Sequence, residues 1–315
     1  MAAYFASLNP VALLRVLPTG VAQGLIWGVM ALGVYMTFKI LDFADLTVDG
    51  SFATGGAVCV MLLMGGCSPA LALVMALLAG ALCGAVTGLL HTALGIPGIL
   101  AGILSQIALY SINLNIMGKA NQSFSVSKTA VLISSGSIAP ALCVGAAFCA
   151  ALIALLYWYF GTEQGSSIRA TGCNEKMARA QGVNTNGMKV ITLALSNGLV
   201  ALSGGMLSQY QGFADVKMGQ GSIVIGLAAV IIGDVLCASI FRRHLNFALK
   251  LTFTVIGSIV YYLVYDFVLW LKFPSDDMKL LTAIVVAIFL SVPYLKERYF
   301  ARPSAPAKKG EKTNA

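Results

Sequence analysis

The stretch from Gly50 to Gly118 contains no Asp, Glu, Lys or Arg, and this feature constrains the fold more than any other. Left in water, so long an apolar run would expose area that nothing compensates, whereas about 20 apolar residues suffice to cross a bilayer as a helix. The whole chain agrees, because only 10% of its residues are charged, against roughly 25% in soluble domains. The sequence therefore predicts an all-α, polytopic membrane protein whose immediate partner is the lipid bilayer.

The apolar runs predict eight full spans and one shorter segment, so that eight or nine transmembrane or half-length helices are expected. The full spans are expected near residues 17–38, 69–90, 98–117, 137–160, 190–212, 220–240, 247–271 and 279–293. The shorter segment, 50–64, is a half-length or tilted span. Residues 1–295 would form one transmembrane domain, and residues 296–315 a basic, disordered cytoplasmic tail.

The long polar interruption at residues 161–189 sets the predicted orientation, because Lys and Arg are enriched in cytoplasmic loops. Its basic residues are Arg169, Lys176, Arg179 and Lys189. Placing this loop inside also places Arg242-Arg243-His244 and the carboxyl-terminal tail inside, and counting backwards places residues 42–49 at the inner side and the amino terminus outside. The net charge of +8 lies in loops and tail rather than along one face, which argues against a nucleic-acid partner.

The residues of this loop predict a short helix from Glu175 to Gln181. Asn174 is a favourable N-cap, Glu175 stands where the helix dipole favours an anion, and Arg179 falls in the last turn. Gly182 supplies the left-handed residue that ends many helices. The segment is either an ordinary solvated connector or a docking element for a motor subunit.

Four aspartates are the acidic candidates for a translocation pathway. Asp42, Asp45 and Asp49 are spaced three and four residues apart, which would put them on one helical face. They would line the inner end of a pathway or form a solvated turn at the membrane interface. Asp234 falls inside a predicted span, where a charge needs a partner, and the arginines at 242–243 are the candidates for a functional or gating contact.

A polar stripe on another predicted span consists of Gln106, Tyr110 and Asn113, at helical spacing. These side chains would hydrogen-bond a translocating solute, or bond neighbouring helices, the interpretation that helix packing in membranes favours. Small residues also recur four apart in two spans, which predicts close packing between helices of this chain. They are Gly20, Gly24, Gly28, Gly80, Gly84 and Gly88.

Several separated motifs resemble one family of transport proteins. Ile168–Asn174 and Ala178–Asn184 resemble the cytoplasmic coupling segment of ABC importer permeases of the branched-chain amino-acid and ribose type. Three further segments look like the same family, in the expected order: Leu41–Phe52, Leu202–Leu207 and Gly226–Asp234. Together with the first of these, Ala108–Leu114 is similar to a subgroup linked with binding proteins for aromatic amino acids.

The resemblance implies a permease in the bacterial cytoplasmic (inner) membrane that imports a small polar solute by alternating access, with an aromatic or branched-chain amino acid expected. It implies three protein partners: an ABC ATPase, an extracytoplasmic substrate-binding protein and a second permease copy. ATP would bind to the ATPase, because this chain has no G-x-x-x-x-G-K-[ST] segment and so no cofactor of its own is expected. The implied ATPase-coupling residues are Arg169, Gly172, Asn174, Glu175, Ala178, Arg179 and Gly182.

Other function classes have less support. The chain has two histidines and neither H-E-x-x-H nor G-x-S-x-G, which argues against an enzyme. Its seven cysteines show no metal-ligand spacing. The main alternative is an ion- or proton-coupled secondary transporter, in which Asp42, Asp45, Asp49 and Asp234 relay cations. A membrane scaffold without transport is the third possibility.

Overall fold

The computed structural model describes residues 10–126, 129, 131–241 and 246–270, together with six single positions between 280 and 291. The tail expected at 296–315 lies outside the described residues, as does most of the span expected at 279–293. Ten α-helices and one π-helix occur in the described part of the chain. They are α2 (Pro10–Tyr35), η1 (Met36–Ile40, the π-helix), α3 (Val48–Met64), α4 (Pro69–Thr92), α5 (Gly98–Met117), α6 (Ile138–Phe160), α7 (Glu163–Cys173), α8 (Glu175–Ala180), α9 (Thr185–Gln211), α10 (Ser222–Ile240) and α11 (Phe247–Trp270).

Seven of these helices are long and apolar enough to cross a membrane, and they correspond to the first seven predicted full spans. The shorter segment expected at 50–64 is α3, an apolar helix of 17 residues. The prediction of a helical membrane protein is therefore confirmed. What the sequence did not suggest is a small antiparallel pair of strands, β1 (Asn121–Ser123) and β2 (Phe213–Asp215).

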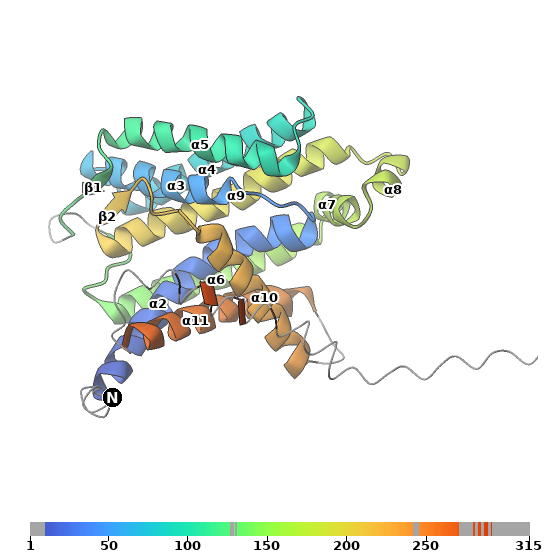
Figure 1. Ribbon diagram of the computed structural model, residues 1–315. Helices are drawn as coiled ribbons and strands as arrows, with labels where there is room; N and C mark the ends of the chain where they lie inside the picture. The colour runs from blue at the N-terminus through green and yellow to red at the C-terminus, as the bar shows by residue number, and fades with distance from the viewer. Residues whose placement is uncertain are drawn as a thin grey trace, which may run out of the picture.

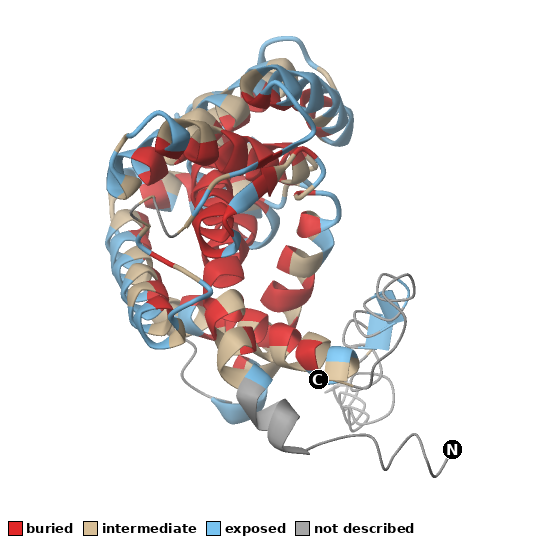
Figure 2. Ribbon diagram, turned by 90° about the vertical axis from the view of Figure 1, so that its left-hand side faces the viewer, coloured by how far each residue is buried: buried red, intermediate tan, exposed pale blue. Residues whose placement is uncertain are grey.

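Figure 1 shows the long helices side by side, with α7 and α8 at one end of the bundle and the two strands at the opposite end. The helix α9 is the core element, since it packs against α4, α3 and α2. Buried residues concentrate around it, whereas the outer faces of α4, α5 and α6 are largely exposed (Figure 2). Exposed apolar faces on peripheral helices are what a bilayer would cover.

Glycines let α4 approach α9 to backbone contact. Gly80 faces the Asn197 carbonyl of α9, and Gly84 faces the carbonyl of Leu193. A side chain at either position would overlap these backbone atoms, so only glycine permits the approach. The predicted packing through small residues is confirmed here.

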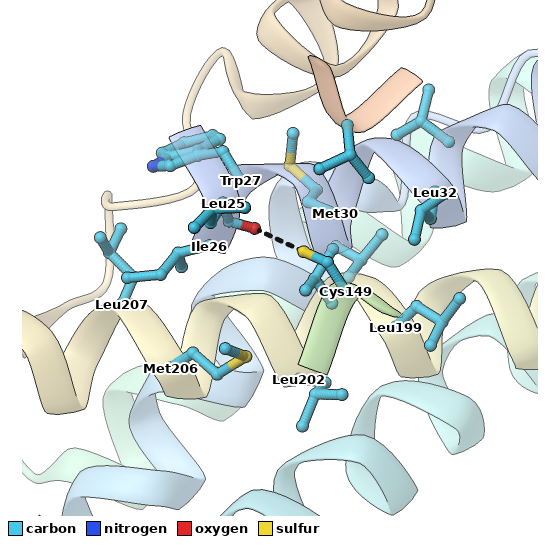
Figure 3. Close-up of a cluster of buried hydrophobic side chains, with 14 of the residues drawn as sticks. Leu25, Ile26, Trp27, Met30, Leu32, Cys149, Leu199, Leu202, Met206 and Leu207 are labelled. Atoms are coloured by element: carbon cyan, nitrogen blue, oxygen red, sulfur yellow. Dashed lines mark hydrogen bonds between the residues drawn. The ribbon is translucent and has the colours of Figure 1, made fainter. Parts of the chain in front are cut away.

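The glycines of α2 serve the same purpose against α11. Gly24 contacts Ile259, and the Ser258 hydroxyl donates a hydrogen bond of 2.6 Å to the Gly24 carbonyl. On its other sides α2 enters the main hydrophobic core, where the Cys149 thiol of α6 donates to the Leu25 carbonyl at 3.3 Å (Figure 3). The first span is thus held by α6, α9 and α11 together.

Candidate functional site

The helix α8 has the local structure that the sequence predicts. The Asn174 side chain accepts a hydrogen bond from the Met177 backbone N–H at 3.0 Å, which caps the first turn. The helix runs from Glu175 to Ala180, one residue shorter than expected, and Gly182 has a φ of +85°. Local capping chemistry alone thus determines a compact helix at the end of the bundle.

Glu175 ties this helix to the start of α9. Its carboxylate accepts from Lys189 Nζ at 2.8 Å and from Arg179 at 2.9 Å, and the Thr185 hydroxyl lies 3.4 Å away. The Lys189 hydrogen bond and the two positive charges lower the pKa of Glu175 below its ordinary value. Because Lys189 and Thr185 belong to α9, these side-chain contacts hold α8 against the core helix.

The remaining predicted coupling residues divide between the surface and the interior. Exposed residues form a shallow cleft of about 510 Å³ on α8, lined by Glu175, Lys176, Arg179 and Ala180. Ala178 is buried, and the Arg169 guanidinium donates to the Phe160 carbonyl at 2.8 Å. Gly172 packs against the carbonyl of Ile40, the last residue of η1. The structure places the exposed set on one surface, and contact with an ATPase stays a prediction.

The three aspartates of the first acidic candidate do not share a helical face, so that prediction is wrong. The helical chain stops at η1 and resumes only at Val48, which leaves Asp42 and Asp45 in an irregular segment. Asp42 has a φ of 54°, a left-handed conformation incompatible with continuing the helix. Asp45 accepts a hydrogen bond from the Thr47 backbone N–H at 2.9 Å, a local bond that competes with helix formation.

Asp45 instead fixes the irregular segment to the core. Its carboxylate accepts a hydrogen bond of 2.6 Å from the side-chain amide of Asn197 on α9. Two residues later, the Thr47 hydroxyl lies 2.8 Å from the hydroxyl of Thr87, which itself donates to Ser105 at 2.7 Å. Buried polar groups therefore hold this segment against α4, α5 and α9.

Asp49, in the first turn of α3, caps the start of α10. Its carboxylate accepts from the backbone N–H groups of Gly221 at 3.0 Å and Ile223 at 2.9 Å, and from the Ser222 hydroxyl at 2.9 Å. A carboxylate at this position also opposes the positive end of the α10 dipole. The contact joins residues more than 170 positions apart in the sequence.

A cleft of about 400 Å³ brings Asp49 together with the predicted polar stripe of α5. We call it the amide cleft, lined by Asp49, Gln106, Tyr110, Ser111, Asn113 and Gln220. Gln106 lies near the middle of the 20-residue α5, a helix about 30 Å long, so the cleft is near mid-depth of the span.

The stripe does not bond α5 to its neighbours. Asn113 is buried, with both polar atoms of its amide lacking a hydrogen-bond partner. Within the described residues, the side chains of Gln106 and Tyr110 likewise make no hydrogen bond to another helix. The interhelical bonds favoured from the sequence are therefore not formed; Gln106 and Tyr110 are accessible at the cleft, whereas the Asn113 amide in the same lining is buried.

Asp234 has a partner that the sequence analysis did not identify. Lys39 Nζ, on the π-helix η1, lies 2.9 Å from Asp234 Oδ2, and both side chains are partly exposed. The arginines at 242–243 expected to reach it lie outside the described residues. Asp49 thus connects the start of α10 to α3, and Asp234 connects α10 to η1.

A second cleft, of about 620 Å³, was missed from the sequence. It lies among α2, α9, α10 and α11, and we call it the aromatic cleft. It is lined by Trp27, Tyr261, Tyr262 and Tyr265, with Gln23, Gln211 and Gln220 as its polar groups. The sequence signal was the pair Tyr261 and Tyr262 with Tyr265 one turn later, but such a pattern more often indicates residues packed in a core. Gln220 lines both clefts.

Comparison with known proteins gives two kinds of match. Residues 16–291 match the family described as the permease component of the branched-chain amino acid transport system. A tyrosine transport system permease protein of Clostridioides difficile (strain R20291) is 40% identical over 269 residues, covering 85% of this chain and 88% of the relative. An uncharacterised protein of Rickettsia prowazekii (strain Madrid E) is 32% identical over 190 residues, covering 60% and 66%. No solved structure matches the chain.

Proposed function

The chain belongs to the family of permease components of branched-chain amino acid transport systems, and on that premise we propose that it imports an aromatic amino acid such as tyrosine. It is the multi-pass permease component of an ABC amino acid transport system and not itself an enzyme. The choice of an aromatic solute is supported by similarity to the tyrosine transport permease, which is 40% identical over a match that covers 85% of this chain.

The observation that carries the proposal is the amide cleft. A buried amide without a partner is costly at membrane depth unless water or a solute supplies its hydrogen bonds. Asn113 is such a group, and it shares the cleft with Gln106 and Asp49. An amide can accept a hydrogen bond from the ammonium and donate one to the carboxylate of an amino acid, so the side chains of Gln106 and Asn113 would bind the solute in transit.

Coupling to ATP would begin at α8. Its exposed Lys176 and Arg179 surface would contact an ABC ATPase that binds ATP, and the Glu175 network would transmit the movement to α9. Gly172, against Ile40, would carry it to η1 and so to α10 through Lys39. The two conformations of the pathway would differ in affinity for the ATP-bound partner.

The remaining partners follow from this arrangement. The α8 end carries the basic loop and would face the cytoplasm, which puts the β1–β2 end outside, where a substrate-binding protein would deliver the solute. A second copy of the permease, with its own ATPase, would complete the transporter in the bacterial inner membrane.

The cation-coupled alternative finds less support in the site. A proton or cation relay needs carboxylates free to exchange their ligand. Asp45 is bonded to Asn197, Asp49 to three groups of α10, and Asp234 to Lys39. Their partners in the described chain leave structural roles as the simpler explanation.

Co-purification and transport test the proposal together. The chain is purified in mild detergent with its candidate ATPase and binding protein and reconstituted into vesicles loaded with ATP. We expect tyrosine uptake that requires ATP and persists with a proton uncoupler. The double substitution Glu175→Ala and Arg179→Ala should release the ATPase, whereas Glu163→Ala, at an exposed position of α7, should retain it. Uptake abolished by the uncoupler at constant ATP would refute the proposal.

A further inference from the structure

We infer that the aromatic cleft binds the ring of the solute and that Tyr265 and Gln211 distinguish aromatic from aliphatic amino acids. The inference rests on the proposed function and adds to it the place where the side chain is recognised. Neither residue was among the pathway residues expected from the sequence. The argument depends on the walls of the cleft, on its unpaired polar groups and on its exposure.

The walls are rings held in a fixed arrangement. Tyr262 lies at ring-centroid distances of 5.6 Å from Trp27, 5.6 Å from Tyr261 and 5.8 Å from Tyr265. Trp27 is stacked on Phe52 of α3, with centroids 4.8 Å apart and an interplanar angle of 27°. Aromatic pairs favour such spacings, and rings already packed lose little freedom when another ring joins them.

The polar groups suit a phenol more than an aliphatic side chain. Gln23, Gln211 and Gln220 come from three different parts of the chain, and within the described residues none of their side chains makes a hydrogen bond. A side-chain amide offers both a donor and an acceptor, which a hydroxyl group can use. Gln211 and Gln220 are exposed and Gln23 is partly buried, so these amides can exchange water for a phenol hydroxyl, a partner that an aliphatic side chain does not offer.

Core packing explains part of the lining but not the whole. Trp27, Tyr261 and Tyr262 are buried, as core residues would be, whereas Tyr265 is partly exposed and Gln211 is exposed. The cleft volume of about 620 Å³ falls within the range of roughly 300–1,000 Å³ for small-molecule sites.

The two clefts differ in chemistry and meet at one residue. The amide cleft is lined by Asp49 and amides, whereas none of the described residues that line the aromatic cleft is charged. Gln220, which lines both, stands just before the start of α10. This division matches an aromatic amino acid, whose charged groups and ring need different surroundings.

Cysteine protection tests the site directly. The complete complex carrying Gln211→Cys is placed in vesicles and treated with a membrane-impermeant maleimide, with labelling measured above that of the chain's own seven cysteines. Tyrosine should slow labelling about threefold or more, and leucine should not. Lys217→Cys, exposed in the loop that follows α9 and β2 and outside the cleft lining, should be unaffected by either. Equal protection by leucine, or none by tyrosine in vesicles that take up tyrosine, overturns the inference.

Transport selectivity gives an independent readout. Tyr265→Leu should lower the preference for tyrosine over leucine about threefold to tenfold, while Tyr265→Phe retains the ring and most of the preference. Tyr157→Leu, on an exposed face of α6, is the matched control and should leave selectivity unchanged. An unchanged preference in Tyr265→Leu contradicts the inference but leaves the proposed function standing. Wild-type vesicles that take up no tyrosine would refute the proposed function, and the inference with it.

Discussion

Two interfaces in this protein differ in whether charged side chains add to the packing of backbone against backbone. Between α4 and α9, Gly80 and Gly84 bring backbone against backbone, which permits one arrangement only. Between α10 and the segment from η1 to the first turn of α3, Gly219 also packs against the Asp49 carbonyl, but two side-chain contacts are added: Asp49 of α3 caps the start of α10, and Asp234 of α10 pairs with Lys39 of η1. Polar contacts beside a cleft can be exchanged for water or solute, so the second interface is the one suited to movement.

We therefore expect one group of helices, which we call the frame, to stay fixed while α10 moves. The frame is α3, α4 and α9, and α8 is joined to it through Glu175. The helix α10 borders the aromatic cleft through Val224 and Ile225, and Asp49, which caps α10, lines the amide cleft. Substitutions in the frame should prevent folding, whereas substitutions at the anchors should affect transport in a folded protein.

The largest effect is expected from Gly84→Leu. Its side chain would overlap the Leu193 carbonyl of α9, at or above the top of the roughly 1–3 kcal/mol cost of overpacking. We expect little monodisperse protein in size-exclusion chromatography after detergent extraction. Val86→Phe, on an exposed face of the same helix, should behave as wild type. Normal recovery of Gly84→Leu would mean that the frame is adaptable.

Asp49→Ala should come next, since it removes three hydrogen bonds at the start of α10. A hydrogen bond to a charged group contributes about 1.5–3 kcal/mol, so uptake should fall more than about tenfold while the protein still folds. Asp49→Asn keeps one acceptor oxygen and should lose less. The exposed Asp42, changed to Asn, is the control, and an equal loss there would contradict the capping role.

A smaller effect is expected at the partly exposed pair of Lys39 and Asp234. Such pairs contribute about 0.2–1 kcal/mol and a like-charge pair costs a similar amount, so Lys39→Asp alone or Asp234→Lys alone should lower the uptake rate about twofold to tenfold. The doubly exchanged protein should recover most of the rate, because the pair is restored with reversed polarity. Additive losses in the double variant would show that the two residues act separately.

The smallest effect concerns pH. Because the pKa of Glu175 is lowered from 4.5, its carboxylate stabilises the folded state fully above about that pH, and the contribution is lost as the pH falls through the lowered folded value. The thermal stability difference between wild type and Glu175→Gln should therefore be constant from pH 6 to 8 and shrink on acidification below about 4.5. A difference that grows on acidification would contradict the assignment.

The sequence was sufficient where structure depends on near neighbours. Asn174 caps α8 through a bond to the residue three positions later, and Gly182 follows the end of the helix. Because both signals are local, α8 could be predicted to within one residue. The long spans followed from apolar length alone. The spacing of Gln106, Tyr110 and Asn113 correctly placed them on one side of α5, facing one cleft.

Contacts between residues that lie far apart in the chain could not be predicted from the sequence. Nothing near Asp49 indicates that it caps a helix beginning at Ser222, and nothing near Asp234 points to Lys39. The break between Ile40 and Val48 contains neither Gly nor Pro, and it is held by bonds to Asn197 and Thr87 on other helices. The tyrosines of α11 were visible, but only the tertiary structure shows that they border a cleft.

The strand pair has a consequence for how the protein is made. Asn121 of β1 pairs with Asp215 of β2, a residue 94 positions later in the chain, at the end of the bundle opposite α8 (Figure 1). During synthesis β1 leaves the ribosome long before β2, and the two candidate spans α6 and α9 must be inserted in between. This end of the nascent protein therefore stays unclosed until α9 has been inserted into the bilayer.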